Sequence, residues 1–147
     1  MEVRIIFCGD REWGDYSTIA ATMLSASDYL VEKGAKLFII EGKCRGADLI
    51  AEHTAKLNGV PYQGFPAEWK RLGKRAGPIR NEQMIVEGRA DGCIAFHDNI
   101  FLSKGTKNMI DTAARYQVPF VLYTAYSYSF LDRCIQHAQE RKKNEKQ

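Results

Sequence analysis

The sequence lacks any apolar run that approaches the roughly 20 residues required by a membrane-spanning helix. Its first residues, Met1 to Ile5, also lack the basic, apolar and small-residue segments of a signal peptide. We therefore expect a cytoplasmic protein that has no membrane partner.

Cysteine and histidine are scarce, with four cysteines and three histidines among 147 residues. The cysteines form no C-x-x-C pair, and Cys8 and Cys93 lie in apolar runs, where a thiol behaves as a small hydrophobic group. No cluster of His, Cys or Asp has the spacing of metal ligands. We therefore expect reduced cysteines, no metal site and no cofactor.

Several common functional fingerprints are missing too. The chain contains neither G-x-x-x-x-G-K-[ST] nor G-x-G-x-x-G, and it has no G-x-S-x-G elbow that would support a Ser-His-Asp nucleophile. A net charge of +3 is too weakly basic to indicate a nucleic-acid-binding protein by itself. Composition therefore leaves the partner undecided.

Short apolar runs that alternate with helical patterns are what the sequence does contain. The predicted strands span residues 3–8, 36–40, 61–65, 92–96 and 119–123. Helices are expected from a cap at Asp15 or Ser17, over 47–57, from near Pro78, from Gly105–Thr106 and over 130–138, and residues 66–77 are expected to be irregular. We predict one domain over residues 1–140 and a charged tail without structure over 141–147.

This alternation predicts an α/β sandwich of three layers, with a mainly parallel five-stranded sheet in the order 3-2-1-4-5 and right-handed crossovers. In such a sheet, ligands bind at the switch point beyond the carboxyl ends of the first and fourth strands. The loops expected there are residues 9–11, 41–48 and 97–106, and each of them carries a glycine.

Two of these loops suit an anion. The loop after the second strand carries Gly42 and Gly46 and leads directly into a helix, whose first turn offers N–H groups and a positive dipole end. The alternative is an ordinary α/β turn with nothing bound. Asp48, in that first turn, can bind a ribose hydroxyl or simply stabilise the helix. In the later loop, Gly105 and Thr106 can cradle a phosphate, or Thr106 can merely cap the helix.

Other side chains have similar alternatives. Arg11, Arg45 and Arg80 lie near loop ends, where a guanidinium fork suits phosphate, although each can equally form a surface salt bridge. Trp69 can stack on a base or pack in the core. His97 and Asp98 follow the fourth strand and are possible acid/base groups, with polar surface as the alternative.

Taken together, these motifs form an ordered set. The set is Gly9-x-Arg11-x-Trp13, Arg45-Gly46-Ala47-Asp48, Ala67-x-Trp69, Gly73-x-x-Ala76-Gly77-x-x-Arg80-Asn81-x-x-Met84 and Lys104-Gly105-Thr106. It resembles the YspA/cpYpsA-related branch of the SLOG superfamily, a Rossmann-like group that includes the LOG phosphoribohydrolases and the DNA-processing protein DprA. The resemblance implies a Rossmann-like sheet that binds a nucleotide or nucleotide-derived ligand, in a protein of bacteria or phages, and a homodimer.

Together with the loop residues above, the resemblance gives a predicted ligand-binding set. It comprises Gly9, Asp10, Arg11, Gly42, Arg45, Gly46, Asp48, Trp69, Arg80, Asn81, Lys104, Gly105 and Thr106. LOG enzymes carry a P-G-G-x-G-T-x-x-E signature, whereas this chain lacks the paired glycines and has Met109 in place of the glutamate. Glu41, Asp48 and Glu82 are the candidate catalytic carboxylates that could replace it.

Three functions follow from these observations. The first is a sensor or sequestering module for a nucleotide-derived small molecule. The second is a nucleotide N-glycosidase that releases a free base through one of the candidate carboxylates. The third is DprA-like binding of single-stranded DNA, supported by the lysine and arginine side chains of residues 70–75 beside Trp69.

Overall fold

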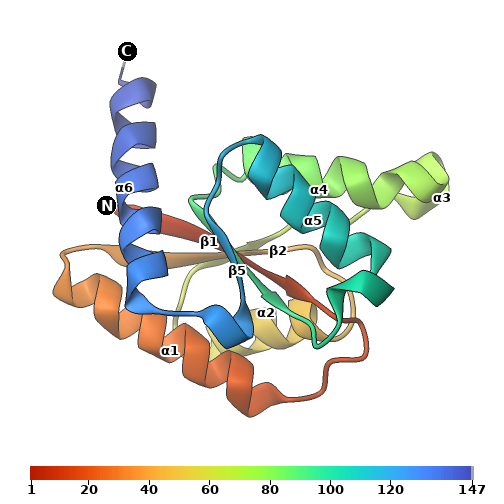
Figure 1. The fold of residues 1–147 in the computed structure, drawn as a ribbon, viewed down its shortest axis with the longest axis horizontal. Helices are drawn as coiled ribbons and strands as arrows, with labels where there is room; N and C mark the ends of the chain where they lie inside the picture. The colour runs from red at the N-terminus through yellow and green to blue at the C-terminus, as the bar shows by residue number, and fades with distance from the viewer. Residues whose placement is uncertain (147) are drawn as a thin grey trace.

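Five parallel strands form the centre of the protein in a computed structural model that describes residues 1–146 (Figure 1). They are β1 (Glu2–Gly9), β2 (Lys36–Glu41), β3 (Tyr62–Gly64), β4 (Gly92–Phe96) and β5 (Phe120–Leu122). The sheet order is β3-β2-β1-β4-β5, and every neighbouring pair is parallel. This confirms the predicted α/β class and strand order.

Helices cover both faces of the sheet, which makes the Rossmann-like sandwich of three layers. The helices are α1 (Tyr16–Glu32), α2 (Ala47–Leu57), α3 (Trp69–Leu72), α4 (Ala76–Val86), α5 (Lys104–Arg115) and α6 (Tyr128–Glu145), with 3-10 turns η1 (Gly73–Arg75), η2 (Ile100–Leu102) and η3 (Tyr123–Ala125). Figure 1 shows α4 and α5 on one side of the strands and α1 and α2 on the other. None of the helices in residues 1–146 is both long and apolar enough to span a membrane.

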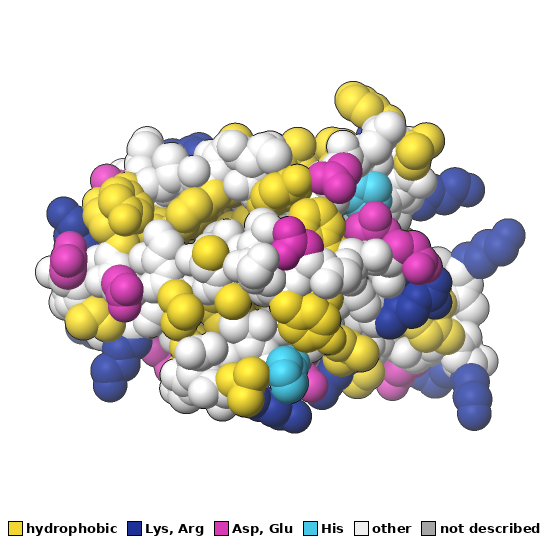
Figure 2. Space-filling view, turned by 90° about the horizontal axis from the view of Figure 1, so that it is seen from below, with side chains coloured by type: hydrophobic (Ala, Val, Ile, Leu, Met, Phe, Trp, Pro, Cys, Tyr) yellow, Lys and Arg dark blue, Asp and Glu magenta, His cyan; other side chains and the backbone are white. Residues whose placement is uncertain are grey.

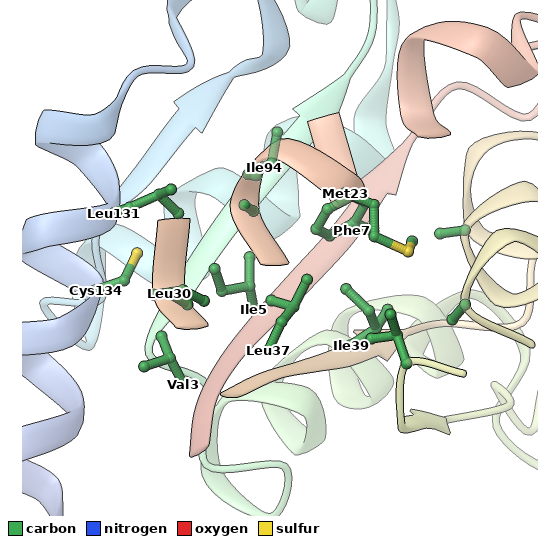
Figure 3. Packing of buried hydrophobic residues seen from close by; sticks show 14 of the residues in the cluster. Val3, Ile5, Phe7, Met23, Leu30, Leu37, Ile39, Ile94, Leu131 and Cys134 are labelled. Atoms are coloured by element: carbon green, nitrogen blue, oxygen red, sulfur yellow. The ribbon is translucent and has the colours of Figure 1, made fainter. Parts of the chain in front are cut away.

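Strand β1 divides the core into two layers because its side chains alternate between the two faces of the sheet. Val3, Ile5 and Phe7 point toward α1, α2 and α6 (Figure 3), whereas Ile6 and Cys8 point toward α4 and α5. All five side chains are buried. Burial on both faces explains why residues 5–8 of this strand are continuously apolar and do not alternate with polar residues.

Side-chain caps fix the starts of two helices that lead out of the carboxyl end of the sheet. Asp15 caps α1 by accepting a hydrogen bond of 3.0 Å from the N–H of Thr18. Ser103 caps α5 by accepting from the N–H of Thr106 at 3.1 Å, so α5 begins at Lys104. Thr106 is therefore not the cap. The stretch expected to be irregular contains α3 and η1, and α4 begins at residue 76, just ahead of the predicted start.

Helix α6 continues farther than the sequence predicted. Asp91 is fully buried, with its carboxylate 2.9 Å from Nε of Arg141 and 2.8 Å from Nδ1 of His137. Arg141 also pairs with Glu145 at 3.2 Å. Because these pairs hold the last turns, the expectation of an unstructured tail is wrong for residues 141–145. Residue 147 of that predicted tail lies outside the described residues.

Candidate ligand-binding site

A cavity of about 690 Å³ opens at the carboxyl ends of the strands, where the loops after β1, β2 and β4 meet helix α4. Its volume lies in the range of pockets that hold small ligands. Figure 2 shows lysine and arginine side chains projecting from the right-hand end of the molecule, the end toward which β1 points in Figure 1. The lining residues are Cys8, Gly9, Asp10, Arg11, Glu12, Cys44, Asp48, Trp69, Lys74, Gly77, Pro78, Arg80, Asn81, Met84, His97, Leu102, Ser103, Lys104, Gly105, Thr106, Asn108 and Met109.

Backbone contacts hold together the loops after β1 and β2 and the last residue of β4. The carbonyl of Asp10 accepts hydrogen bonds of 3.1 Å from the N–H groups of both Trp13 and Ala47. A Cβ at Gly46 would lie 2.3 Å from that carbonyl oxygen, and its φ of 81° disfavours other residues. At Gly9, a Cβ would lie 2.1 Å from the carbonyl oxygen of Phe96. Both glycines are therefore required by close backbone approach.

Asp48 and Arg80 are buried charged residues in the lining of the cavity. Asp48 is 5% exposed and Arg80 is 7% exposed. The Asp48 carboxylate accepts from the N–H of Cys44 at 3.3 Å, while Arg80 donates to the carbonyl of Gly42. Burial raises the pKa of Asp48 to about 6 even though the Arg80 guanidinium opposes the shift. Asp48 is therefore a carboxyl group whose charge is sensitive to a bound ligand.

The first turn of α5 provides the opposite wall. Asn81 connects it to α4, because its Nδ2 donates to Oδ1 of Asn108 at 2.9 Å. The first N–H groups of an α-helix have no acceptor within the helix. Apart from its chain neighbours and the backbone of its own helix, no heavy atom lies within 4 Å of the Cβ position of Gly105, so open space adjoins these donors. This turn, with Lys104 beside it, has the properties of a phosphate-binding site.

Trp69 stands at the mouth of the cavity. Trp69 is 45% exposed, which argues against the core-packing alternative. The indole rests on Gly77, where a Cβ would lie 3.2 Å from the ring, and the guanidinium carbon of Arg11 lies 5.5 Å from the ring centroid. Leu102, which is 82% exposed, also contributes to the lining. The entrance therefore combines flat apolar surface with positive charge.

The structure brings together most of the predicted ligand-binding residues and separates a few. Gly42, Arg45 and Gly46 do not line the cavity; the two glycines support its loops as described, and Arg45 forms an ion pair of 2.5 Å with Glu12 on the exposed rim. His97 lines the cavity, and its Nδ1 accepts from the N–H of Asn99 at 2.9 Å. Asp98 instead accepts from the hydroxyl of Tyr123 at 2.6 Å.

Among the three candidate catalytic carboxylates, only Asp48 lines the cavity. Glu82 accepts from the hydroxyl of Tyr116 at 2.5 Å on the exposed side of α4. Glu41 is fully buried under the loop that follows β2. Across residues 1–146, no group of three or more His, Cys, Asp or Glu side chains could hold a metal ion.

Sequence analysis missed several lining residues. Met84 and Met109 line the cavity, although the sequence marks Met84 only as part of the ordered motif set and Met109 only as the residue in place of the LOG glutamate. Cys8 was expected to be a small hydrophobic group and Lys74 to belong to a basic stretch, whereas both line the cavity, as does Cys44. Residue periodicity tells which face of a helix is buried, but not that one end of that face borders a cavity.

Comparisons with known proteins agree with this architecture. The sequence model of the YspA, cpYpsA-related SLOG family matches residues 3–72. The Gene 61 protein of Mycobacterium phage D29 is 32% identical over 125 residues, which cover 80% of this chain and 94% of that protein.

Two DNA processing proteins A (DprA) share the fold. The structure from Streptococcus pneumoniae has a TM-score of 0.60 at 18% identity, over 95% of this chain and 56% of that one. The structure from Helicobacter pylori, described for its single-stranded DNA binding mode, has a TM-score of 0.53 at 19% identity, over 82% of this chain and 64% of that one. The chain therefore spans less than two thirds of either DprA chain. Sequence and fold together show that this chain belongs to the YspA, cpYpsA-related SLOG family.

Proposed function

We propose that the cavity binds a nucleotide or a nucleotide-derived molecule. The observation that carries this proposal is the convergence of three kinds of group on one cavity of about 690 Å³. The first turn of α5 at Gly105 suits a phosphate, the carboxylate of Asp48 suits ribose hydroxyls, and Trp69 suits a base. Arg11 and Lys104 add positive charge for the phosphate.

Binding without hydrolysis is the function that the site supports best. Met109, which stands where LOG enzymes have a glutamate, is buried and lines the cavity, so this position offers no charge to an oxocarbenium-like transition state. Asp48 is the one candidate carboxylate left to an N-glycosidase mechanism, and Arg80 lies beside it. We therefore propose a sensor or sequestering module, with N-glycosidase activity as the alternative.

Titration calorimetry with nucleoside 5′-monophosphates and the matching nucleosides tests the proposal. In Gly105→Ala the new methyl group enters open space, so the fold is retained while the phosphate subsite is obstructed. We expect at least a tenfold loss of affinity for the monophosphate and little change for the nucleoside. Gly14→Ala is the matched control, because its Cβ position is equally open and it lies outside the cavity lining.

Two results would contradict the nucleotide proposal: no binding of any monophosphate, or unchanged affinity in Gly105→Ala. Chromatography of the same mixtures after incubation distinguishes binding from hydrolysis. Release of a free base by the wild type and not by Asp48→Asn would establish the N-glycosidase alternative.

Single-stranded DNA is the second candidate, favoured by the charge around Trp69. Lys70, Arg71, Lys74 and Arg75 occupy α3 and η1 at the mouth, and all are exposed. Aromatic rings flanked by positive charge suit stacked bases and their phosphates. The DprA of Helicobacter pylori, which shares the fold, is described as binding single-stranded DNA.

Salt dependence distinguishes a polynucleotide from a mononucleotide. For oligothymidylate we expect the logarithm of the binding constant to fall with the logarithm of salt by about 0.7 per phosphate contacted. Lys70→Gln combined with Lys74→Gln should reduce the magnitude of that slope by more than about 0.7, the value for one phosphate contact. Binding of oligonucleotides without any binding of mononucleotides would make the polymer the ligand.

A further inference from the structure

A second group of charged side chains lies directly behind the loop that forms one wall of the cavity. Glu41 ends β2 and is fully buried, and Glu52 on α2 is 9% exposed. Lys43 lies in the loop between them, where its ammonium pairs with Glu52 and its backbone N–H donates to Oε1 of Glu41 at 2.7 Å. None of the three residues lines the cavity.

Lys43 is held in an unusual backbone conformation. Its φ of 61° lies in the left-handed region, which is uncommon for a residue other than glycine. Glu41 binds the backbone of Lys43 and Glu52 binds its side chain, so two carboxyl groups hold this conformation. Gly64 leaves room for the arrangement, because a Cβ there would lie 2.3 Å from Cε of Lys43 and 2.5 Å from Oε2 of Glu41.

The neighbours of Lys43 make the contacts that build the cavity wall. The carbonyl of Gly42 accepts from Arg80, and the N–H of Cys44 donates to Asp48. A change in the conformation of Lys43 therefore moves these contacts of Asp48 and Arg80.

Both cations of this group pair with Glu52, and neither pairs with Glu41. Lys43 is the cation in direct contact, and Lys56 lies 3.7 Å from the outer oxygen of Glu52. Oε2 of Glu41 has no hydrogen-bond partner among the described residues, which is costly for a buried carboxylate. A proton on that oxygen removes one negative charge and supplies a hydrogen-bond donor, and Glu52 carries the other buried oxygen, Oε1, without a hydrogen-bond partner among the described residues.

The pKa values agree with this distribution of charge. Burial raises the pKa of Glu41 to about 8, and the nearby carboxylates of Glu52 and Asp48 add to the shift. Burial opposes ionisation of Glu52 as well, but Lys43 and Glu41 together hold the pKa of Glu52 below its usual value. Tyr62, on β3, is the remaining titratable group that faces Lys43.

We propose that Glu41 and Glu52 share one proton, and that this proton holds Lys43 and with it the loop that positions Asp48 and Arg80. Glu41 is thus a positioning residue for the ligand site, acting through Lys43. Loss of the proton in alkaline solution frees the loop. The functional importance of the loop rests on the proposed ligand site, whereas the effect of the proton on the conformation of the loop can be tested without a ligand.

The experiment follows Glu41 and the loop by NMR from pH 5 to 10 in the unliganded protein. We expect the side-chain carboxyl carbon of Glu41 to titrate between about pH 7 and 9. The amide signals of Lys43 and Cys44 should shift with the same midpoint. In Glu41→Gln, whose amide replaces the protonated carboxyl, those shifts should disappear, whereas the exposed-site control Glu82→Gln should retain them.

Titration of Glu41 below pH 6 would overturn the proposal, as would amide shifts that persist in Glu41→Gln. Adenosine 5′-monophosphate then tests the coupling, and we expect at least tenfold weaker binding at pH 9.5 than at pH 7 in the wild type but not in Glu41→Gln. Equal pH dependence in the two proteins would refute the coupling. A loop that responds to pH in a protein that never binds the nucleotide would contradict the proposed function alone.

Discussion

Asp48 is a buried carboxyl group that should make the stability of the protein depend on pH. Its carboxyl group is 5% exposed, and burial raises its pKa from 3.8 to about 6. A carboxyl group whose pKa is higher in the folded than in the unfolded protein binds protons preferentially in the folded state. It therefore favours folding fully only below its unfolded pKa, and that contribution is lost as the pH rises through its folded pKa.

The size of the effect follows from the shift. A change in pKa from 3.8 to about 6 corresponds to a loss of about 3 kcal/mol in the free energy of unfolding between acidic and neutral pH. Asp48→Asn cannot lose this contribution, because its amide stays neutral. We expect the free energy of unfolding of the variant, relative to wild type, to rise by about 2–3 kcal/mol between pH 4 and pH 8. A difference of this size in the free energy of unfolding corresponds to a difference of about 5–10 °C in Tm.

Urea denaturation followed by tryptophan fluorescence measures this difference at a series of pH values. Comparing the two proteins at each pH isolates Asp48, since Glu41 and the other titrating groups occur in both. Asp28→Asn, on the exposed side of α1, serves as the exposed-site control. A difference between Asp48→Asn and wild type that stays constant, or that falls with rising pH, would refute the reasoning, because Arg80 would then fully stabilise the ionised carboxylate.

Two further predictions concern the framework of the site. Gly46→Ala combines a positive φ with a clash against the Asp10 carbonyl and should lower the free energy of unfolding by about 3 kcal/mol. Gly59→Ala has a positive φ but open space, so a loss of about 1 kcal/mol is expected by urea denaturation, and equal losses would contradict the clash. Asp91→Ala leaves Arg141 and His137 on α6 without their buried carboxylate partner and should cost about 3–5 kcal/mol, with loss of α6 helicity by circular dichroism; a cost below 1 kcal/mol would show that the network is dispensable.

The sheet and the place of the cavity were predictable from the sequence because both depend on local patterns. Apolar runs that are buried on both faces identify parallel strands, and glycine loops at their carboxyl ends identify the switch point. Cap residues were partly predictable, since Asp15 caps α1 as expected whereas Ser103 and not Thr106 caps α5. Both residues of that pair can cap a helix, so composition alone does not choose between them.

Long-range contacts account for what the sequence could not give. Whether Glu41, Asp48 or Glu82 borders the cavity depends on how β2, α2 and α4 pack, and all three carboxylates look alike in the sequence. The extension of α6 depends on Asp91, which directly precedes β4 and is distant in sequence from Arg141. In the sequence, the charged residues at the end of α6 are typical of a solvated tail, and only the structure shows that one of them binds a buried carboxylate.

Because the carbonyl of Asp10 joins two loops, the cavity can form only after the central strands of the sheet have paired. The loop after β1 bonds through this carbonyl to the loop after β2, and Gly9 is pressed against the end of β4, so chain segments near residues 9, 46 and 96 must all be in place together. A fragment that ends before β4 therefore lacks one side of the site even if its own strands pair. The site should therefore be lost only when the whole protein unfolds. A bound molecule should then protect the amide hydrogens of all three central strands from exchange to the same extent.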